Sequence, residues 1–270
     1  MYIVFDIGGT TTRFASSIDG SAISDTKTEP TPQNLDDAIT LYKKMVNDLA
    51  NGQKIDGIAG GIAGPFNAEK TMLVNAPHLP QWVNKPLDQK FQTIADCPIF
   101  LENDTAVAGL GEAARGAGHG YKIVAYLAVG TGIGGSRIVA GRIDANSIGF
   151  EPGHMVVAKD QTLEQEISGT TIMQIYHKKA SELEDPAYWH EFEQELAVGL
   201  NNITVMWSPD IIVLGGGVIL QAQVNIDRVS LLLYKVLKIY PKLPRVVKAT
   251  LGDHSGIEGS LVYLKQKLGS

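Results

Sequence analysis

Two glycine turns in this sequence hold residue types that bind phosphate groups. Residues 6–11 (DIGGTT) and residues 130–135 (GTGIGG) each follow an apolar run. Glycines let backbone N–H groups approach an anion closely, and the adjacent threonine hydroxyls add further donors. The carboxylate of Asp6 suits a hydrated Mg²⁺ beside bound phosphates. For one such turn alone, an ordinary hairpin in which Asp6 caps local N–H groups is the alternative interpretation.

The second turn also matches the dinucleotide-binding pattern G-x-G-x-x-G through Gly130, Gly132 and Gly135. That pattern binds a dinucleotide only where a helix follows the glycines. Residues 136–141 (SRIVAG) indicate a strand instead, which disfavours a dehydrogenase. Neither turn continues into Gly-Lys-Ser or Gly-Lys-Thr, so a P-loop is excluded. A third glycine turn, Gly215–Gly217, follows another expected strand, and the three turns together favour a nucleotide-binding protein.

A carboxylate suited to acid–base chemistry follows the short apolar run at residues 99–101. Asn103 and Asp104 lie between this expected strand and residues 106–114, whose small side chains predict a closely packed helix. A base at this position takes a proton from a substrate hydroxyl as the hydroxyl oxygen attacks phosphorus. Asp and Asn are also preferred helix N-caps, which is the alternative interpretation.

A second polar cluster comes from Glu151, His154 and Glu164. These side chains suit paired hydrogen bonds to vicinal hydroxyls, as on a sugar. A structural or surface role is the alternative for His154, and a metal role is disfavoured because few soft ligands lie nearby in the sequence. Trp82 either packs on a sugar face or belongs to the core.

Hairpins are expected to position the two phosphate turns. Residues 2–5 are apolar before the first turn, and an alternating segment follows it as far as residue 15. Residues 123–129 and 136–139 repeat this pattern around the second turn, about 120 residues further along. A strand, a tight turn and a second strand are typical of a hairpin, so the two halves of the chain begin alike.

Helices alternate with the expected strands along the rest of the chain. Residues 35–49 have apolar side chains at three- and four-residue spacing, which predicts an amphipathic helix with Asn34 as its N-cap. Further strands are expected at 55–63 and 211–214, and further helices at 190–207 and 257–268. This alternation predicts an α/β protein with two duplicated domains and a boundary near residues 112–121.

Composition excludes several classes of protein. The chain has 270 residues, a formal net charge of −6 and no basic block, so neither nucleic acid nor a membrane surface is an expected partner. The single cysteine, Cys97, forms no intramolecular disulfide. No apolar run approaches the 18 or so residues of a membrane span, and residues 1–10 lack a signal-peptide pattern. A soluble, cytoplasmic protein is therefore expected.

Taken in order, these motifs resemble those of the ROK family of sugar kinases, within the actin-like ATPase superfamily. The resemblance rests on residues 6–13 (DIGGTTTR) and 130–135 (GTGIGG) as phosphate motifs, 64–65 (GP) with 75–82 (NAPHLPQW) as a sugar-side loop, 102–104 (END) as the strand end with the catalytic aspartate, 151–154 (EPGH) and 163–169 (LEQEISG) as sugar motifs, 212–218 (IVLGGGV) as the adenosine motif, and 252–260 (GDHSGIEGS) as the C-terminal signature. The matches keep the family's order across nearly the whole chain.

The resemblance implies an α/β fold of two ribonuclease-H-like lobes around a central cleft. Residues 1–112 would form the N-terminal lobe and residues 113–256 the C-terminal lobe. Residues 257–270 would form a helix that packs back on the N-terminal lobe. The family is commonly dimeric, so a homodimer is expected.

The resemblance also implies a hexose kinase that depends on ATP and Mg²⁺, with glucose as the expected substrate and glucose 6-phosphate as the product. Asp104 would be the general base. Sugar hydroxyls would be held by Gly64, Asn103, Asp104, Glu151, His154 and Glu164. ATP would be held by Asp6, Gly8, Gly9, Thr10, Thr11, Thr131, Gly132, Gly215, Gly216 and Gly217, with Asp6 positioning Mg²⁺.

The sequence departs from the family's pattern in one segment. Many members place a cysteine-rich zinc loop between the two sugar motifs, whereas residues 155–162 (MVVAKDQT) contain no cysteine, so no structural zinc is expected. This change leaves the sugar open, with an N-acetylhexosamine kinase, a fructokinase or a non-catalytic sugar-binding protein as alternatives. Repressors of the family carry a DNA-binding module before the first phosphate motif, which begins here at Asp6, so none is expected.

Overall fold

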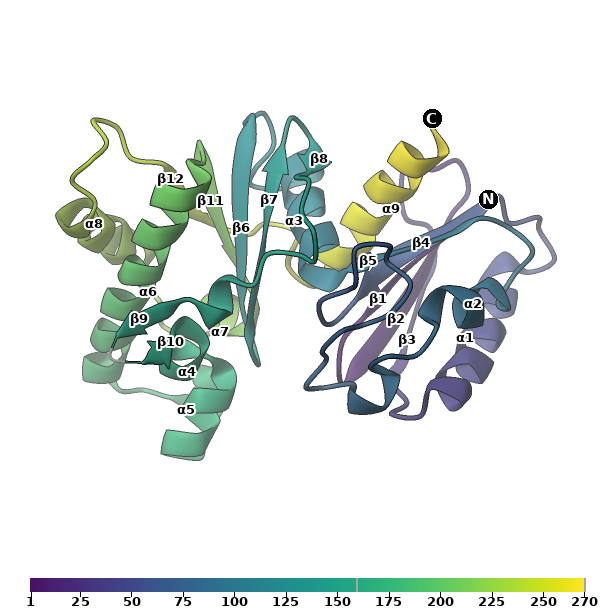
Figure 1. Ribbon diagram of the computed structural model, residues 1–270, viewed down its shortest axis with the longest axis horizontal. Helices are drawn as coiled ribbons and strands as arrows, with labels where there is room; N and C mark the ends of the chain where they lie inside the picture. Colours follow the sequence, from purple (N-terminus) through teal and green to yellow (C-terminus); the bar gives the residue numbers. More distant parts are fainter. Residues whose placement is uncertain (159, 270) are drawn as a thin grey trace. The chain divides into compact units, whose positions relative to one another are not determined.

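The computed structural model describes residues 1–158 and 160–269. The chain folds into two compact units, and Figure 1 labels most of the helices and strands of each. The N-terminal unit contains the described residues of Met1–Gly111, Ala145–Gly149 and Asp253–Ser270. The C-terminal unit contains those of Glu112–Asp144 and Phe150–Gly252. Each unit has its own sheet and its own hydrophobic core.

The N-terminal unit is built on a five-stranded mixed sheet with the order β3-β2-β1-β4-β5. Its strands are β1 (Tyr2–Ile7), β2 (Thr11–Ser17), β3 (Thr26–Pro30), β4 (Gly57–Ile62) and β5 (Ile99–Asn103). β1, β2 and β3 form an antiparallel meander, while β4 runs parallel to β1 and β5 runs parallel to β4. The predicted first hairpin is confirmed, because β1 and β2 pair across the first glycine turn.

Helices cover both faces of this sheet. The helix α1 (Leu35–Ala50) begins at Asn34, whose side chain accepts hydrogen bonds from two N–H groups of the first turn, as predicted. Its apolar face packs in one core with Ile3 and Phe5 of β1. Successive strand residues point to opposite faces, and the side chain of Asp6 lies against Gly256 of α9 (Ser255–Leu268), so α9 covers the other face.

Shorter elements complete the N-terminal unit. They are the 3₁₀-helix η1 (Pro80–Trp82), α2 (Leu87–Gln92) and the start of α3 (Asp104–Arg115), which follows β5 directly. Trp82 is fully buried in the core, and its indole N–H donates to the carbonyl of Gln33. The interpretation of Trp82 as a core residue is therefore the correct one.

The C-terminal unit repeats the same sheet order, β12-β11-β6-β7-β8. Its strands are β6 (Ile123–Val129), β7 (Ile133–Val139), β8 (Arg142–Ile143), β11 (Ile211–Gly215) and β12 (Arg245–Lys248). β6, β7 and β8 form the meander, while β11 runs parallel to β6 and β12 parallel to β11. Since β7 rather than a helix follows the second glycine turn, the dinucleotide interpretation is excluded.

Two long helices pack together in the C-terminal unit, α6 (Pro186–Trp207) and α8 (Ile226–Val236). Between the second hairpin and α6 lie η2 (Pro152–His154), the small hairpin β9 (Val156–Ala158) and β10 (Gln161–Thr162), α4 (Leu163–Ile167), α5 (Gly169–Tyr176) and η3 (Ala180–Glu182). The helix α7 (Gly217–Gln221) follows β11, and η4 (Gly252–His254) precedes α9.

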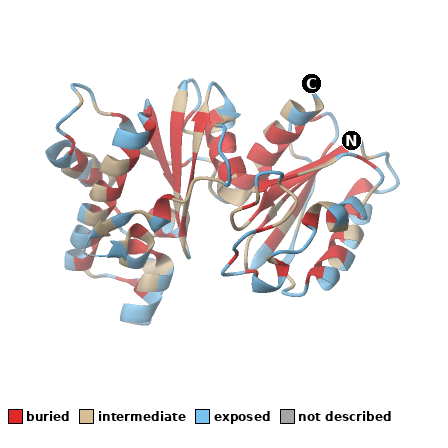
Figure 2. Ribbon diagram, viewed as in Figure 1, coloured by how far each residue is buried: buried red, intermediate tan, exposed pale blue. Residues whose placement is uncertain are grey.

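The predicted α/β class with two duplicated units is confirmed by these two sheets of identical strand order. Figure 2 shows the central strands of each sheet as buried and the outward helix faces as exposed. Among the described residues, no helix has the length and apolar character needed to cross a membrane.

Candidate active site

The first glycine turn joins β1 to β2 and directs its carbonyl groups into hydrogen bonds with the segment that follows β3. The Gly8 carbonyl accepts from Thr31 Oγ1 at 2.8 Å, and the Gly9 carbonyl accepts from Gln33 Nε2 at 3.1 Å. The Thr10 carbonyl accepts from the Thr31 N–H at 2.9 Å. The N–H groups of Gly9 and Thr10 have no acceptor among the described residues. Unpaired N–H groups of successive residues are the donors of an anion-binding turn.

The second glycine turn joins β6 to β7. As in the first turn, its carbonyl groups accept hydrogen bonds while N–H groups remain without acceptors on the described chain. The Gly130 carbonyl accepts from the Gly169 N–H at 2.8 Å. The Thr131 carbonyl accepts from the N–H of Thr170 at 3.1 Å and from its hydroxyl at 2.8 Å. The N–H groups of Thr131 and Gly132 have no acceptor in the described part of the chain. Both turns therefore offer donors to an anion.

The third glycine turn lies against the end of β6. Gly216 has a φ of +85°, and a Cβ atom there would lie 2.3 Å from the carbonyl oxygen of Val129. A Cβ atom on Gly215 would lie 2.5 Å from the hydroxyl of Tyr126. Both positions require glycine, and Gly217 then begins α7. The structure thus brings the third turn next to the strand that ends at the second.

Two carboxyl groups with raised pKa values lie in the N-terminal unit. Burial, together with the charges of Asp104 and Asp253, raises the pKa of Asp6 to about 7, against the opposing charge of Arg13. Burial raises the pKa of Asp104 to about 6. The guanidinium of Arg13 donates to the carbonyl of Asp253, which fixes that cation beside the cluster. Carboxylates perturbed in this way are typical of acid–base and metal-binding sites.

Asn103, rather than Asp104, caps the helix α3. The Asn103 side-chain oxygen accepts from the Ala106 N–H at 3.0 Å and from the Thr105 hydroxyl at 2.7 Å. Its amide nitrogen donates to the carbonyl of Gly64 at 3.1 Å. Because Asn103 supplies the cap, the carboxylate of Asp104 accepts a hydrogen bond from the Thr105 N–H at 2.8 Å and does not reach further into the first turn of the described helix. The capping alternative for Asp104 is therefore wrong.

The buried carboxylate of Glu102 holds this strand end in place. It accepts from the backbone N–H of Asn103 at 2.9 Å and from the ammonium of Lys70 at 2.5 Å. The ammonium of Lys70 also lies 5.8 Å from the centre of the Phe66 ring. This buried, charge-assisted pair holds Asn103 and Asp104 in place at the end of β5.

The sugar-side candidates gather at the start of β7 in the C-terminal unit. Glu164 Oε2, on α4, accepts from the Ile133 N–H at 2.6 Å. Glu151 and His154 flank Gly153 in η2, where a Cβ atom on Gly153 would lie 2.3 Å from the Ile133 carbonyl. The backbone of Ile133 therefore contacts both η2, next to Glu151 and His154, and the side chain of Glu164 on α4.

The segment between these sugar-side candidates is tied down by hydrogen bonds. The Leu163 N–H donates to the Met155 carbonyl at 2.9 Å, across the mouth of the β9–β10 hairpin. Thr162 and Gln165 form a capping box at the start of α4. Within the described residues, no group of three or more His, Cys, Asp or Glu side chains is arranged to hold a metal ion.

Comparison with known proteins identifies the family. The model of the ROK family matches residues 2–267. The chain belongs to the ROK family. As a ROK protein it is 25% identical to a glucokinase of Thermotoga maritima, over 98% of this chain and 97% of that one. It is 27% identical to an N-acetyl-D-glucosamine kinase of Pectobacterium atrosepticum, over 96% and 97%.

Solved structures of ROK proteins share the fold. A ROK glucokinase from Streptomyces griseus, in complex with glucose and AMPPNP, matches with a TM-score of 0.84 at 23% identity over 98% of this chain and 99% of that one. A ROK hexokinase from Thermus thermophilus matches with a TM-score of 0.84 at 23% identity over 99% of each chain. These matches confirm the predicted two-lobe α/β fold.

The structure places the predicted ROK site residues in two groups. The N-terminal unit holds Asp6, Gly8, Gly9, Thr10, Thr11, Gly64, Asn103 and Asp104. The C-terminal unit holds Thr131, Gly132, Glu151, His154, Glu164, Gly215, Gly216 and Gly217. Within each unit the predicted residues lie on strand ends, turns or helix starts, and their roles remain proposals.

Sequence reasoning gave no role to Glu112, a fully buried carboxylate in α3. It accepts from the N–H groups of Leu251 at 2.8 Å, Ala117 at 2.9 Å and Thr250 at 3.2 Å. Glu112 therefore holds together the two segments by which the chain enters and leaves the C-terminal unit. An acidic residue within the small-residue run 106–114 was the available signal.

Proposed function

We propose that this chain transfers the γ-phosphate of ATP to a hexose hydroxyl, with glucose as substrate and glucose 6-phosphate as product. The observation that carries the proposal is the carboxyl group of Asp104, whose pKa is raised to about 6 and which is spared from helix capping by Asn103. A carboxylate with a pKa near the working pH is suited to accept the proton of an attacking hydroxyl. A cytoplasmic location is part of the proposal, since ATP is the co-substrate.

The two glycine turns support the nucleotide side of the proposal. Gly8–Thr11 would bind phosphate through the N–H groups of Gly9 and Thr10, and the second turn through those of Thr131 and Gly132. Gly215–Gly217 would face the adenosine. The carboxylate of Asp6 fits a hydrated Mg²⁺. The positive charge of the ion would stabilise the ionised carboxylate and so lower the raised pKa of Asp6. The ion would neutralise charge on the transferred phosphoryl group.

Phosphoryl transfer passes through a loose transition state, so positioning and charge neutralisation account for most of the rate. In the proposed step, the hexose hydroxyl oxygen forms a bond to the γ-phosphorus while the bond from that phosphorus to the β,γ-bridging oxygen breaks. Asp104 accepts the hydroxyl proton, and ADP leaves. Proton transfer to a positioned base is worth about 10²–10⁴-fold.

Hexose hydroxyls would be held by Gly64, Asn103, Asp104, Glu151, His154 and Glu164. In support, relatives named as glucokinases cover almost the whole chain. The Streptomyces griseus glucokinase of the same fold binds glucose and AMPPNP.

We also propose that the protein is a homodimer. Light scattering would test this by measuring the mass of the particle in solution.

A second candidate is an N-acetylglucosamine kinase. It is favoured by relatives of that name at 27% and 28% identity, slightly above the 25% of two glucokinases. Glucose and N-acetylglucosamine differ only at the sugar's 2-position, so the residues that would surround this position would distinguish the two substrates.

The deciding experiment is an ADP-release assay with Mg²⁺-ATP and a panel of hexoses. The panel contains glucose, mannose, fructose, allose, N-acetylglucosamine and N-acetylmannosamine, with the Asp104→Asn variant as control. Turnover of glucose that is lost in the variant supports the proposal. Turnover of N-acetylglucosamine alone supports the second candidate, and turnover of fructose alone a fructokinase. No turnover with any sugar, despite sugar binding, favours the non-catalytic alternative.

A further inference from the structure

One loop of the N-terminal unit lies against both the first phosphate turn and Gly64, the residue that Asn103 contacts. At one end of the loop, a Cβ atom on Gly64 would lie 2.6 Å from the carbonyl oxygen of Asn75, and the Gly64 carbonyl is the partner of Asn103. At the other end, a Cβ atom on Gly9 would lie 2.3 Å from Cβ and 3.2 Å from Cγ of His78. The loop 75–78 therefore spans from Asn103 to the phosphate turn.

The contact with His78 explains why residue 9 is glycine. Any side chain at this position would overlap the start of the histidine side chain and approach the His78 carbonyl at 3.3 Å. This close approach puts the imidazole beside a turn whose N–H groups of Gly9 and Thr10 have no acceptor on the described chain. The side chain of His78 is exposed and makes no hydrogen bond to another described residue.

A second observation places His78 near the candidate base. Burial raises the pKa of Asp104, and backbone hydrogen bonds and, to a smaller extent, the charge of His78 lower it. His78 and Asp104 belong to the same unit, and the strength of such an effect falls with the distance between the two groups. His78 thus lies close to the group that would take the hydroxyl proton and touches the turn that would bind phosphate.

We propose that the imidazole of His78 binds the terminal phosphate of the nucleotide and stabilises the phosphoryl group during its transfer. The proposal rests on the proposed kinase function and adds His78 to the residues that would contact the nucleotide. An imidazolium N–H makes a charge-assisted hydrogen bond to a phosphate oxygen. Such a donor stabilises the transition state most where its position is fixed in advance, and the packing on Gly9 positions the Cβ and Cγ atoms from which the ring extends.

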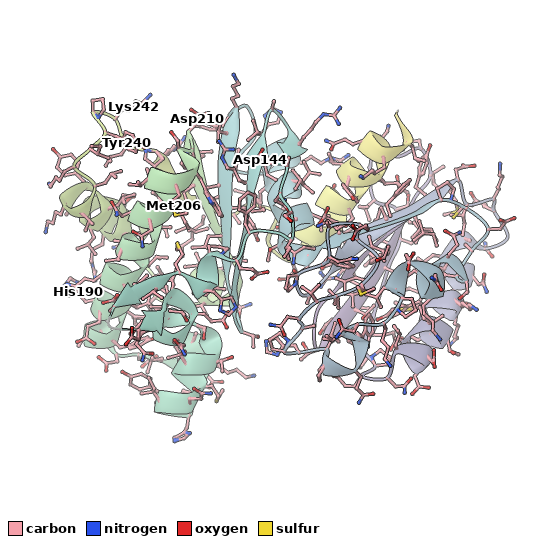
Figure 3. All side chains as sticks on the ribbon, viewed as in Figure 1. Asp144, His190, Met206, Asp210, Tyr240 and Lys242 are labelled. Atoms are coloured by element: carbon pink, nitrogen blue, oxygen red, sulfur yellow. The ribbon has the colours of Figure 1, made fainter. Side chains whose placement is uncertain are left out.

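The structure permits a test that separates the imidazole from the packing of the loop. In His78→Ala the Cβ atom that contacts Gly9 remains, so the loop keeps its closest contact and loses only the ring. His78→Gln keeps a hydrogen-bond donor without the positive charge. The matched control is His190→Ala, which removes an exposed histidine from α6 of the other unit, where its ring is hydrogen-bonded to Gln194 (Figure 3).

The measurements are dissociation constants for Mg²⁺-ADP and Mg²⁺-AMPPNP by calorimetry, and kcat and KM for the hexose that the wild type phosphorylates. A residue that binds the terminal phosphate of ATP contacts the corresponding group of AMPPNP, and ADP has no such group. His78→Ala should therefore weaken AMPPNP about 10-fold or more with less than about a 2-fold change for ADP, and lower kcat by about 10²-fold at a hexose KM within about 3-fold of wild type. The affinity and kcat of His78→Gln should lie between those of wild type and of His78→Ala, and His190→Ala should match wild type.

Equal weakening of ADP and AMPPNP, or a kcat unchanged in His78→Ala, would overturn the inference. The nucleotide arm is independent of the sugar. If the wild type phosphorylates no hexose but His78→Ala still loses the preference for AMPPNP over ADP, the proposed function fails and the inference about His78 stands. If the wild type binds neither nucleotide, both fail.

Discussion

The side chain of Glu164 accepts a hydrogen bond from the backbone N–H of Ile133 at 2.6 Å, directly after the second phosphate turn. The same carboxylate lies where a side chain on Gly132 would be, 2.5 Å from its Cβ position. The turn is held on its other side by Gly169 and Thr170 of α5. A residue expected to bind sugar thus fixes the shape of a turn expected to bind nucleotide.

Loss of this hydrogen bond should affect both ligands. We expect Glu164→Ala to raise the KM values of both hexose and ATP by about 10-fold, because a hydrogen bond to a charged acceptor contributes about 1.5–3 kcal/mol. Glu166→Ala removes a carboxylate from the same short helix and should leave both values within about 2-fold of wild type. Steady-state kinetics with each substrate varied in turn checks this, and an ATP KM that stays constant in Glu164→Ala would show that the turn does not depend on Glu164.

Replacement of the candidate base should abolish chemistry without affecting nucleotide binding. Asp104→Asn keeps the oxygen that accepts the Thr105 N–H, so the helix start is preserved. We expect kcat to fall by at least ~10²-fold while the dissociation constant of Mg²⁺-AMPPNP stays within about 3-fold. Single-turnover kinetics and calorimetry measure the two quantities separately, and a kcat close to that of wild type would remove Asp104 from the mechanism.

The two raised pKa values predict how activity depends on pH. Asp104, with a pKa of about 6, must be ionised to accept a proton, and Asp6, with a pKa of about 7, must be ionised to hold Mg²⁺. Below these values both are neutral, so kcat/KM for ATP should rise from pH 5 to about pH 7.5, with a slope above one at the acid end. A profile measured at constant ionic strength checks this, and a flat profile over that range contradicts it.

The same group makes a prediction for stability. The pKa of Asp6 is raised on folding from 3.8 to about 7, so its contribution to stability is complete below pH 3.8 and is lost as the pH rises to about 7. Asp6→Asn cannot ionise and should have a Tm a few °C above that of wild type at pH 8, with the advantage disappearing near pH 4. Thermal melts at the two pH values, in the absence of nucleotide and Mg²⁺, measure the difference. A variant less stable than wild type at pH 8 would show that the ionised carboxylate is well solvated.

A close helix crossing provides a prediction about folding. A Cβ atom on Gly259 of α9 would lie 1.7 Å from the carbonyl oxygen of Val107 in α3. Since the carbonyl belongs to a helix backbone and the added Cβ atom is attached to another, neither can move aside freely, and Gly259→Ala should lower the free energy of unfolding of the N-terminal unit by about 3 kcal/mol. Ser260 is no control, because its hydroxyl donates to the Phe5 carbonyl, but Lys267→Ala tests the helix propensity of α9 at an exposed position. Urea denaturation compares the two variants.

Sequence patterns predicted the elements whose side chains alternate between core and solvent. The helix α1 shows this most clearly, since Asn34 and the apolar spacing mark its start and its buried face. The strand β3 has the sequence TKTEP, in which four of five residues are exposed, so no hydrophobic pattern marks it. The helix α8 was missed although Asn225 caps it and its apolar residues have helical spacing. That omission had a readable signal, whereas β3 exists only through its pairing with β2.

The candidate site was predictable in residue types but not in partners. The order of motifs identified Asn103 and Asp104, yet only the structure shows that Asn103 supplies the helix cap and binds the Gly64 carbonyl. The contact of Glu164 with Ile133 joins residues 31 positions apart, and no local pattern encodes it. In the two phosphate turns, neighbouring segments donate hydrogen bonds to the carbonyl groups and leave the N–H groups without acceptors on the described chain. These contacts between distant segments cannot be read from the sequence.

The last helix has a consequence for how the protein is made. The hydroxyl of Ser260 in α9 donates to the carbonyl of Phe5 in β1, 255 residues earlier in the chain. One face of the first sheet therefore stays uncovered on the ribosome until almost the whole sequence has been translated, while most of the C-terminal unit, residues 112–252, has already emerged. Domains fold as units during synthesis, so the C-terminal unit should finish folding before the N-terminal unit. The nascent N-terminal half would be the part that molecular chaperones have to protect.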